Sequence, residues 1–247
     1  MLITIVTVTK DDPVGLTRTA RSLARFVSEY ADCEWLVIDA STRYFDANRT
    51  MLATLCDRVR HRASSDRGPY DAMNAALDLA HGEWVWFLNG GDAATRHVSD
   101  IVPTLVAIHD HVSHVIYPVL VKDGDAIDRP GRIGGRMRHR TLLMITNPIC
   151  HQGIISRRHR GGPFDWESYP ILADYALWID NILNEKDKYV VRTVPVAYYY
   201  TGGLSSEQAR KSKIDQERRI LRAKSRLGYL LFQLKQVYRL FRYGRSN

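Results

Sequence analysis

Short apolar runs alternate with amphipathic stretches along the first half of the chain. Leu2–Val8 is nearly all apolar and rich in β-branched residues, which is typical of a strand buried on both faces. Apolar residues then recur at helical spacing from Leu16 to Val27. This alternation, with short connections, predicts a doubly wound α/β sheet, mostly parallel, with helices on both faces. Further strands are predicted at Trp35–Ile38, Val59–His61, Trp84–Leu88 and Val115–Val121, and further helices at Thr50–Leu55, Tyr70–Ala80 and Val98–His109.

Polar clusters follow four of these strands. They are Thr7–Lys10, Asp39–Thr42, Ser64–Gly68 and Asn89–Asp92. In open parallel sheets, ligands bind beyond the carboxyl ends of the strands. The pattern therefore predicts that four clusters from distant parts of the sequence converge on one crevice.

The pattern changes after residue 121. Residues 122–141 are rich in glycine and arginine and are predicted to form a mobile loop. Strands are predicted at Ile154-Ile155 and Tyr189–Val194, and a helix at Leu172–Leu183. Asp174 stands in the first turn of that helix.

The net charge of +8 over 247 residues is unevenly distributed. Residues 1–128 carry a net charge of −6, whereas residues 129–160 hold eight arginines and no carboxylate. Residues 206–247 hold 12 Lys and Arg against three Asp and Glu. A strong positive charge is typical of nucleic-acid-binding proteins, but an acidic crevice repels a polyanion, so we expect no nucleic-acid partner.

Cysteine usage and the N-terminus indicate the compartment. Cys33, Cys56 and Cys150 are far apart and do not form a disulfide framework or a zinc motif. The N-terminus lacks the basic region of a signal peptide, and no stretch reaches the roughly 18 apolar residues that span a bilayer. We therefore expect a cytoplasmic protein.

The turn Asn89-Gly90-Gly91-Asp92 follows a buried strand and is a candidate metal site. A carboxylate there can bind a hard divalent cation, which takes oxygen ligands and often keeps waters and substrate phosphates. The two glycines allow a ligand to approach the backbone closely. Glycine and aspartate are also ordinary turn residues, so the spacing alone leaves a metal site and a plain turn both open.

Several of these segments carry recognisable motifs. Thr4–Lys10, Val37–Ser41, the run Ser-Asp-Arg-Gly-Pro-Tyr-Asp-Ala-Met-Asn at 65–74, and Gly82–Asp92 together resemble glycosyltransferase family 2. The run at 65–74 is the most specific, and it is similar to the signature of bacterial exopolysaccharide and glycolipid transferases. The likeness covers roughly residues 1–205. It implies a GT-A fold, a nucleotide-sugar donor, a divalent metal (Mn²⁺ or Mg²⁺) and transfer with inversion at the anomeric carbon.

The resemblance also implies which residues hold the donor and the metal. The family's metal motif usually carries two or three carboxylates, whereas this sequence keeps only Asp92, with Asn89 and Gly91 where carboxylates often stand. Asp92 is thus the implied metal ligand. The implied donor-binding residues are Thr7, Thr9, Asp39, Asp66, Gly68, Asp71, Asn74 and Gly91.

Ala173-Asp174-Tyr175 resembles the family's catalytic-base motif, which implies that Asp174 is the general base. An acceptor hydroxyl must lose a proton as it attacks the anomeric carbon, and a carboxylate within hydrogen-bond reach can take that proton. Without the resemblance, an aspartate in the first turn of a helix would be interpreted as a residue that interacts with the positive end of the helix dipole.

Two further groups are candidates for the diphosphate or the acceptor. His151-Gln152 matches a His-Gln pair of relatives, although a buried histidine bonded to the backbone is an equally good interpretation. In the arginine-rich stretch, one or more of Arg132, Arg136, Arg138 and Arg140 can close over the donor diphosphate or meet a phosphorylated lipid acceptor. A solvated basic loop is the alternative.

Residues 206–243 are predicted to form one long amphipathic helix with basic flanks, which suits a helix lying in an anionic membrane surface. Docking on the protein core or on another subunit is the alternative. The apolar positions are Leu227, Leu230, Leu231, Leu234, Val237, Tyr238 and Phe241.

The domain interpretation is a GT-A domain over 1–205 and a basic helical tail over 206–247. Within the domain, 1–121 is the nucleotide-sugar half and 122–205 the acceptor and catalytic half. We predict an inverting glycosyltransferase that acts on a lipid-linked glycan or glycolipid, peripheral on the inner face of the plasma membrane. The alternatives are an inactive nucleotide-sugar-binding protein and a nucleic-acid-binding protein; the oligomeric state stays open.

Overall fold

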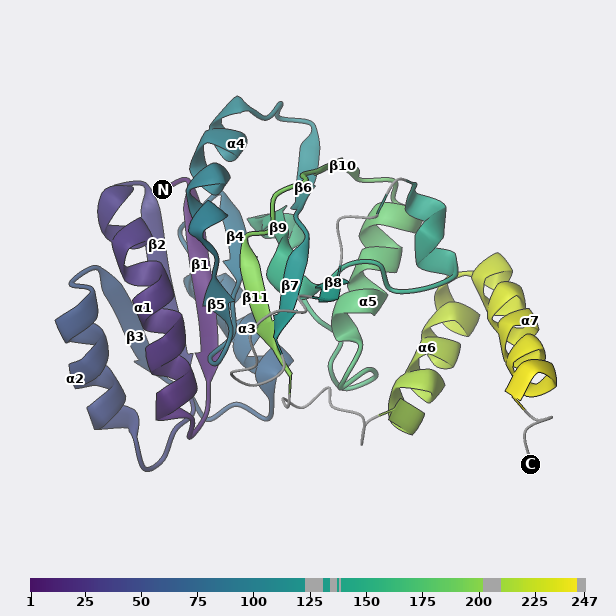
Figure 1. The fold of residues 1–247 in the computed structure, drawn as a ribbon, viewed down its shortest axis with the longest axis horizontal. Helices are drawn as coiled ribbons and strands as arrows, with labels where there is room; N and C mark the ends of the chain where they lie inside the picture. The colour runs from purple at the N-terminus through teal and green to yellow at the C-terminus, as the bar shows by residue number, and fades with distance from the viewer. Residues whose placement is uncertain (123–130, 134–136, 138, 202–209, 244–247) are drawn as a thin grey trace.

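The computed structural model describes residues 1–122, 131–133, 137, 139–201 and 210–243. A seven-stranded sheet forms its centre, in the order β10-β6-β9-β4-β1-β2-β3 (Figure 1). All neighbouring strands run parallel except β9, which is antiparallel to β4 and β6. The strands are β1 (Ile3–Thr9), β2 (Cys33–Asp39), β3 (Val59–Ala63), β4 (Trp84–Phe87), β6 (Val112–Ile116), β9 (Ile154–Arg157) and β10 (Lys188–Val191).

Helices cover both faces of the sheet, as the sequence predicts. Side chains alternate along β1, so that Ile3 and Ile5 pack with α1 on one face, whereas Val6 and Val8 pack with α3 and α5 on the other. The helices are α1 (Pro13–Glu29), α2 (Phe45–Leu55), α3 (Pro69–Leu79), α4 (Ile101–Ala107) and α5 (Ala173–Trp178), with short 3₁₀ segments at η1 (Arg96–Asp100), η2 (Arg140–Met144), η3 (His151–Gly153) and η4 (Arg158–Arg160), and a π-helical turn η5 (Ile179–Asn184) after α5.

The single strand predicted at Val115–Val121 is wrong. The chain forms β6 and then β7 (Val119–Lys122), which are separated at Tyr117-Pro118. Proline has no backbone N–H for the ladder, so the strand ends there and the chain enters a second sheet. That sheet has the order β5-β11-β7-β8, with β5 (Ala93–Ala94), β8 (Gly131–Ile133) and β11 (Ala197–Tyr200). The loop predicted over 122–141 therefore contains a strand at β8.

The tail also differs from the single helix predicted over 206–243. It forms α6 (Arg210–Lys224) and α7 (Arg226–Tyr243), which pack against each other. They separate at Ser225, whose hydroxyl accepts the N–H of Gly228 at 3.2 Å in the manner of a helix N-cap. Ile220, Leu221 and Phe232 are buried in the same core as α3 and α5. In Figure 1, α6 lies between α5 and α7.

Candidate active site

The four predicted polar clusters lie side by side at the carboxyl ends of β1 to β4, which confirms their convergence. Backbone hydrogen bonds join the ends of these strands: the N–H of Ala40 donates to Thr9, that of Ser64 to Asp39, and that of Gly90 to Val8, each at 2.9 Å. The ends of the four strands thus form one continuous edge of the sheet, where the sequence pattern places the crevice.

Asp39 is a fixed charge in the floor of this edge. Only 1% of its surface is exposed. Its carboxylate accepts hydrogen bonds from the Ser41 N–H (2.8 Å), Asn48 Nδ2 (2.9 Å) and His61 Nε2 (3.0 Å). Burial alone would raise the pKa of Asp39, but these hydrogen bonds lower it to about 2. Asp39 is therefore ionised at neutral pH, and both of its oxygens are engaged by the protein.

The two threonines of β1 lie in different environments. Thr7 is wholly buried, and its hydroxyl accepts a hydrogen bond from Trp35 Nε1 at 3.0 Å inside the helix-covered face of the sheet. The Thr7 side chain therefore faces the core, and its predicted role in donor binding stays a prediction. Thr9 lies at the crevice edge against Gly90, and its buried Oγ1 has no protein partner. This hydroxyl is therefore unpaired and buried at the edge of the crevice.

The signature run at 65–74 shapes a loop and ties the two halves together. Gly68 has a φ of +152°, and its N–H donates to Asp66 Oδ1 at 3.1 Å. Asp71 accepts the Arg67 N–H at 2.9 Å. Asn74 bonds with both amide atoms to the backbone of Phe164, at 2.7 and 2.9 Å. Its position supports a structural link to the C-terminal half rather than a donor contact.

The turn after β4 is held by two residues of α1 that sequence reasoning missed. Gly91 has a φ of +99°, which favours glycine. Its carbonyl accepts Arg18 Nη1 at 2.9 Å, and Arg18 lies over the ring of Tyr200, 4.2 Å from the centroid. The hydroxyl of Thr19 donates to the carbonyl of Asp92 at 2.6 Å. The positively charged guanidinium group of Arg18 therefore lies beside the candidate metal turn.

Asp92 is 5% exposed and is oriented by two hydrogen bonds. Oδ1 accepts the backbone N–H of Tyr200 at 3.0 Å, and Oδ2 accepts Gln152 Nε2 at 2.6 Å. Gln152 is itself buried, and its Oε1 accepts the thiol of Cys150 at 2.7 Å. Burial raises the pKa of Asp92, because the charged form is poorly solvated there.

A single-carboxylate metal site is compatible with this geometry. The described residues contain no group of three or more His, Cys, Asp or Glu side chains that could hold a metal ion. Mg²⁺ is often bound by one or two carboxylates together with substrate phosphates. Each oxygen of Asp92 accepts one hydrogen bond and keeps a second lone pair. A cation would also relieve the cost of the buried negative charge.

Asp174 lies at the start of α5, 7% exposed, and is linked to the metal turn through His151. Asp174 Oδ1 accepts the N–H of Tyr175 at 2.7 Å, and Oδ2 lies 3.8 Å from His151 Nδ1. The other ring nitrogen of His151 is 3.0 Å from Asn89 Nδ2. Asn89 Oδ1 is buried without a protein partner. The structure thus brings Asn89, His151 and Asp174 together from three separate segments.

Two residues from elsewhere in the chain support Asp174. The hydroxyl of Tyr70 donates to the carbonyl of Ile171 at 3.1 Å, and burial together with nearby Asp174 raises its pKa well above the usual range. Gln216 of α6 is buried, and its Oε1 accepts the N–H groups of Ile171 and Leu172 at 3.0 and 3.1 Å. These bonds fix the segment immediately before α5.

The structure describes only some of the arginines that are candidates for binding a diphosphate or a phosphorylated acceptor. Arg136 and Arg138 lie outside the described residues, and Arg132 lies in β8. Arg140 Nη1 donates to the carbonyl of Ile182 at 3.1 Å, which ties η2 to η5.

The sheet order and the polar edge at its carboxyl ends are those of the GT-A fold, and solved glycosyltransferases superpose on this chain. TarS of S. aureus superposes with a TM-score of 0.64 at 16% identity, over 89% of this chain and 39% of the solved TarS chain. The mannosyltransferase PcManGT of Pyrobaculum calidifontis, solved with GDP-Man and Mn²⁺, gives 0.64 at 15% identity, over 94% and 68% of the two chains.

Comparison with family models identifies the family of the chain. Residues 4–160 match Glycosyl transferase family 2, and the chain belongs to this family. A PGL/p-HBAD biosynthesis glycosyltransferase of Mycobacterium tuberculosis is 31% identical over 185 residues, which cover 71% of this chain and 68% of that protein. The resemblance drawn from the motifs at 4–92 is therefore confirmed, and the protein is a glycosyltransferase.

Proposed function

We propose that the protein transfers one sugar from a nucleotide-sugar to a hydroxyl of a lipid-linked glycan or glycolipid, with inversion at the anomeric carbon. The observation that carries the proposal is the linkage of Asp92 and Asp174, two buried carboxylates at one crevice, through Gln152, His151 and Asn89. The similarity to a protein named for PGL biosynthesis supports a glycolipid acceptor. A TarS fragment solved with UDP-GlcNAc supports a nucleotide-sugar donor.

Asp174 is the proposed general base. It takes the proton of the acceptor hydroxyl as the oxygen attacks the anomeric carbon opposite the departing diphosphate. The carboxylate is held by the Tyr175 N–H on one oxygen, which leaves the other free to accept a proton. His151 Nδ1 lies 3.8 Å from that second oxygen, and hydrogen bonds from Tyr70 and to Gln216 hold the preceding backbone in place.

Asp92 would hold Mn²⁺ or Mg²⁺, and a bound cation would offset the charge that develops on the diphosphate. Gln152 orients Asp92 through its 2.6 Å hydrogen bond. Thr9 and Asn89 lie at the same edge, and each has a buried side-chain oxygen without a protein partner. Asp39, Asp66, Gly68 and Asp71 shape the floor and the loop of the nucleotide side.

The proposed location is the cytoplasmic face of the plasma membrane, where a lipid-linked acceptor is presented. Among the helices that the structure describes, none is long and apolar enough to cross a bilayer.

A thermal-shift screen tests the donor class. Full-length protein is heated with UDP-, dTDP- and GDP-sugars, each with Mn²⁺ or Mg²⁺. A true donor at 100 times its Kd stabilises the fold by about 2.7 kcal/mol through mass action. For a chain of this size, the Tm then rises by roughly 5–10 °C. The nucleoside monophosphates serve as controls with the same base. A Tm that no nucleotide-sugar moves at millimolar concentration would contradict donor binding.

A further inference from the structure

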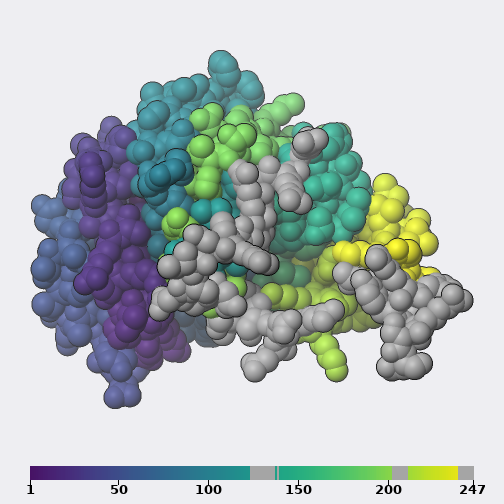
Figure 2. Space-filling model, viewed as in Figure 1, coloured from purple at the N-terminus to yellow at the C-terminus, as the bar shows by residue number. Residues whose placement is uncertain are grey.

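The outward side of α7 exposes a row of large apolar side chains. We call Leu227, Leu230, Leu234, Val237 and Tyr238 the α7 stripe; their exposed fractions are 55, 56, 58, 49 and 60%. Arg226 is the one other exposed residue between positions 226 and 238. The spacing of three and four residues places the stripe on one face of the helix. In Figures 1 and 2, α7 lies at the edge of the molecule, beyond α6.

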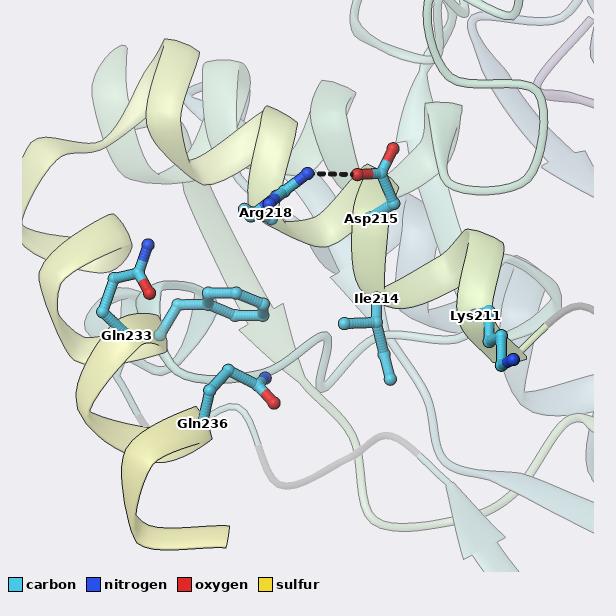
Figure 3. A pocket seen from close by; sticks show the side chains of 7 residues that line it. Lys211, Ile214, Asp215, Arg218, Gln233 and Gln236 are labelled. Atoms are coloured by element: carbon cyan, nitrogen blue, oxygen red, sulfur yellow. Dashed lines mark hydrogen bonds and ion pairs between the residues drawn. The ribbon is translucent and has the colours of Figure 1, made fainter. Parts of the chain in front are cut away.

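The opposite side of α7 is occupied by the protein. Phe232 is 3% exposed and belongs to the core. Gln236 points from α7 towards α6 across a groove of about 340 Å³, whose far wall is formed by Ile214 and Arg218 (Figure 3). Lys235 donates to the carbonyl of Ile145 at 3.1 Å and so ties α7 to η2. Packing on the core therefore explains the inner face of α7 but leaves the stripe uncovered.

The charge of α7 distinguishes between two candidate partners for the stripe, a second copy of the chain and a lipid bilayer. The sequence of α7 contains Arg226, Arg239 and Arg242, besides Lys235, which lies 3.8 Å from Glu217 of α6, and it has no Asp or Glu. A second copy would bring these positive charges together, and five exposed side chains are few against the 20–30 residues that each partner contributes to a standard interface. Apolar residues with basic flanks instead match an anionic bilayer, where the helix lies with its apolar face at the headgroup–acyl boundary.

We propose that the α7 stripe docks the protein on an anionic phospholipid bilayer. Docking would also position the crevice, because α6 connects α7 to the candidate base: Gln216 holds Ile171 and Leu172, which directly precede α5. The acceptor side of the crevice is then held near the lipid surface. This second consequence rests on the proposed function, whereas bilayer binding does not.

Substitution of the stripe in the full-length protein tests the proposal. Leu230→Gln, Leu234→Gln and Val237→Gln change exposed positions only, so the core stays intact. Vesicles of phosphatidylcholine with phosphatidylglycerol, and vesicles of phosphatidylcholine alone, are co-sedimented with the protein. We expect the native protein to bind the anionic vesicles at least tenfold more tightly, and the triple variant to lose at least tenfold of that affinity. Val14→Gln with Val106→Gln, at positions 70 and 72% exposed on α1 and α4, is the control and should bind normally.

Three outcomes would overturn the proposal: no binding of the native protein to anionic vesicles, unchanged binding of the triple variant, or a native dimer that the triple variant makes monomeric without any vesicle binding. The last would assign the stripe to a second copy. The donor-induced thermal shift is measured on the same variants and should not change. A lost vesicle interaction is thereby distinguished from a failure of the proposed sugar transfer.

Discussion

Asp174→Asn is expected to lower kcat for sugar transfer by about 10³-fold, within the range that general-base catalysis contributes. Asparagine keeps the shape of the side chain and can still accept the Tyr175 N–H, so the start of α5 should be preserved. It cannot take up the acceptor proton at neutral pH. The donor affinity should be unchanged, because the nucleotide lies at the ends of β1 to β4 in the proposed complex.

The matched control for this variant is Asp165→Asn. Asp165 is exposed in the same half of the protein and accepts the N–H of Ser168 at 3.1 Å, so the substitution removes the same charge without touching the proposed base. Initial rates and donor titrations on both variants give the comparison. If Asp174→Asn keeps more than a tenth of the native kcat, Asp174 is not the base.

Asp92→Asn is expected to weaken metal-dependent donor binding by at least about 100-fold. An amide binds a hard divalent cation less well than a carboxylate, and the Asn89–Asp92 turn contains Asp92 as its single acidic residue. The same change should also lower the stability of the donor-free protein. A neutral side chain avoids the cost of a buried charge, but the amide NH2 of asparagine must face either Gln152 Nε2 or the Tyr200 N–H, both of which donate to Asp92.

Calorimetric titration of donor with and without Mn²⁺, together with the Tm of the donor-free protein, measures both effects. Exposed Asp78, on α3 of the same half, supplies the control Asp78→Asn, which should alter neither quantity. Equal donor affinity in the native protein and in Asp92→Asn, with the metal present, would remove Asp92 from the metal site.

Local patterns predict the nucleotide half well because its signals lie close together in the sequence. The apolar runs at Leu2–Val8 and Trp84–Leu88 and the polar residues after them are enough to place the strands and their converging ends. The burial of the Thr7 side chain had a signal in the local sequence pattern. Alternation along β1 places residue 7 on the same face as Ile3 and Ile5, against α1, where Trp35 bonds its hydroxyl.

The support around Asp174 could not be predicted, because it is made of long-range contacts. His151 meets Asn89 across 62 positions, and Gln216 reaches Leu172 across 44. No periodicity or turn signal encodes such pairs. Local chemistry did mark two breaks that were missed: Pro118 ends β6, and Ser225 caps α7.

The anomeric configuration of the first sugar released tests the account most directly. Without an acceptor, water can take the place of the attacking hydroxyl, so hydrolysis of an α-linked nucleotide-sugar by concentrated protein can be followed by proton NMR before the anomers equilibrate. Direct displacement with Asp174 as base predicts that the β-anomer accumulates first and that Asp174→Asn abolishes the signal. Initial release of the α-anomer, or unchanged release by Asp174→Asn, would contradict the proposed mechanism.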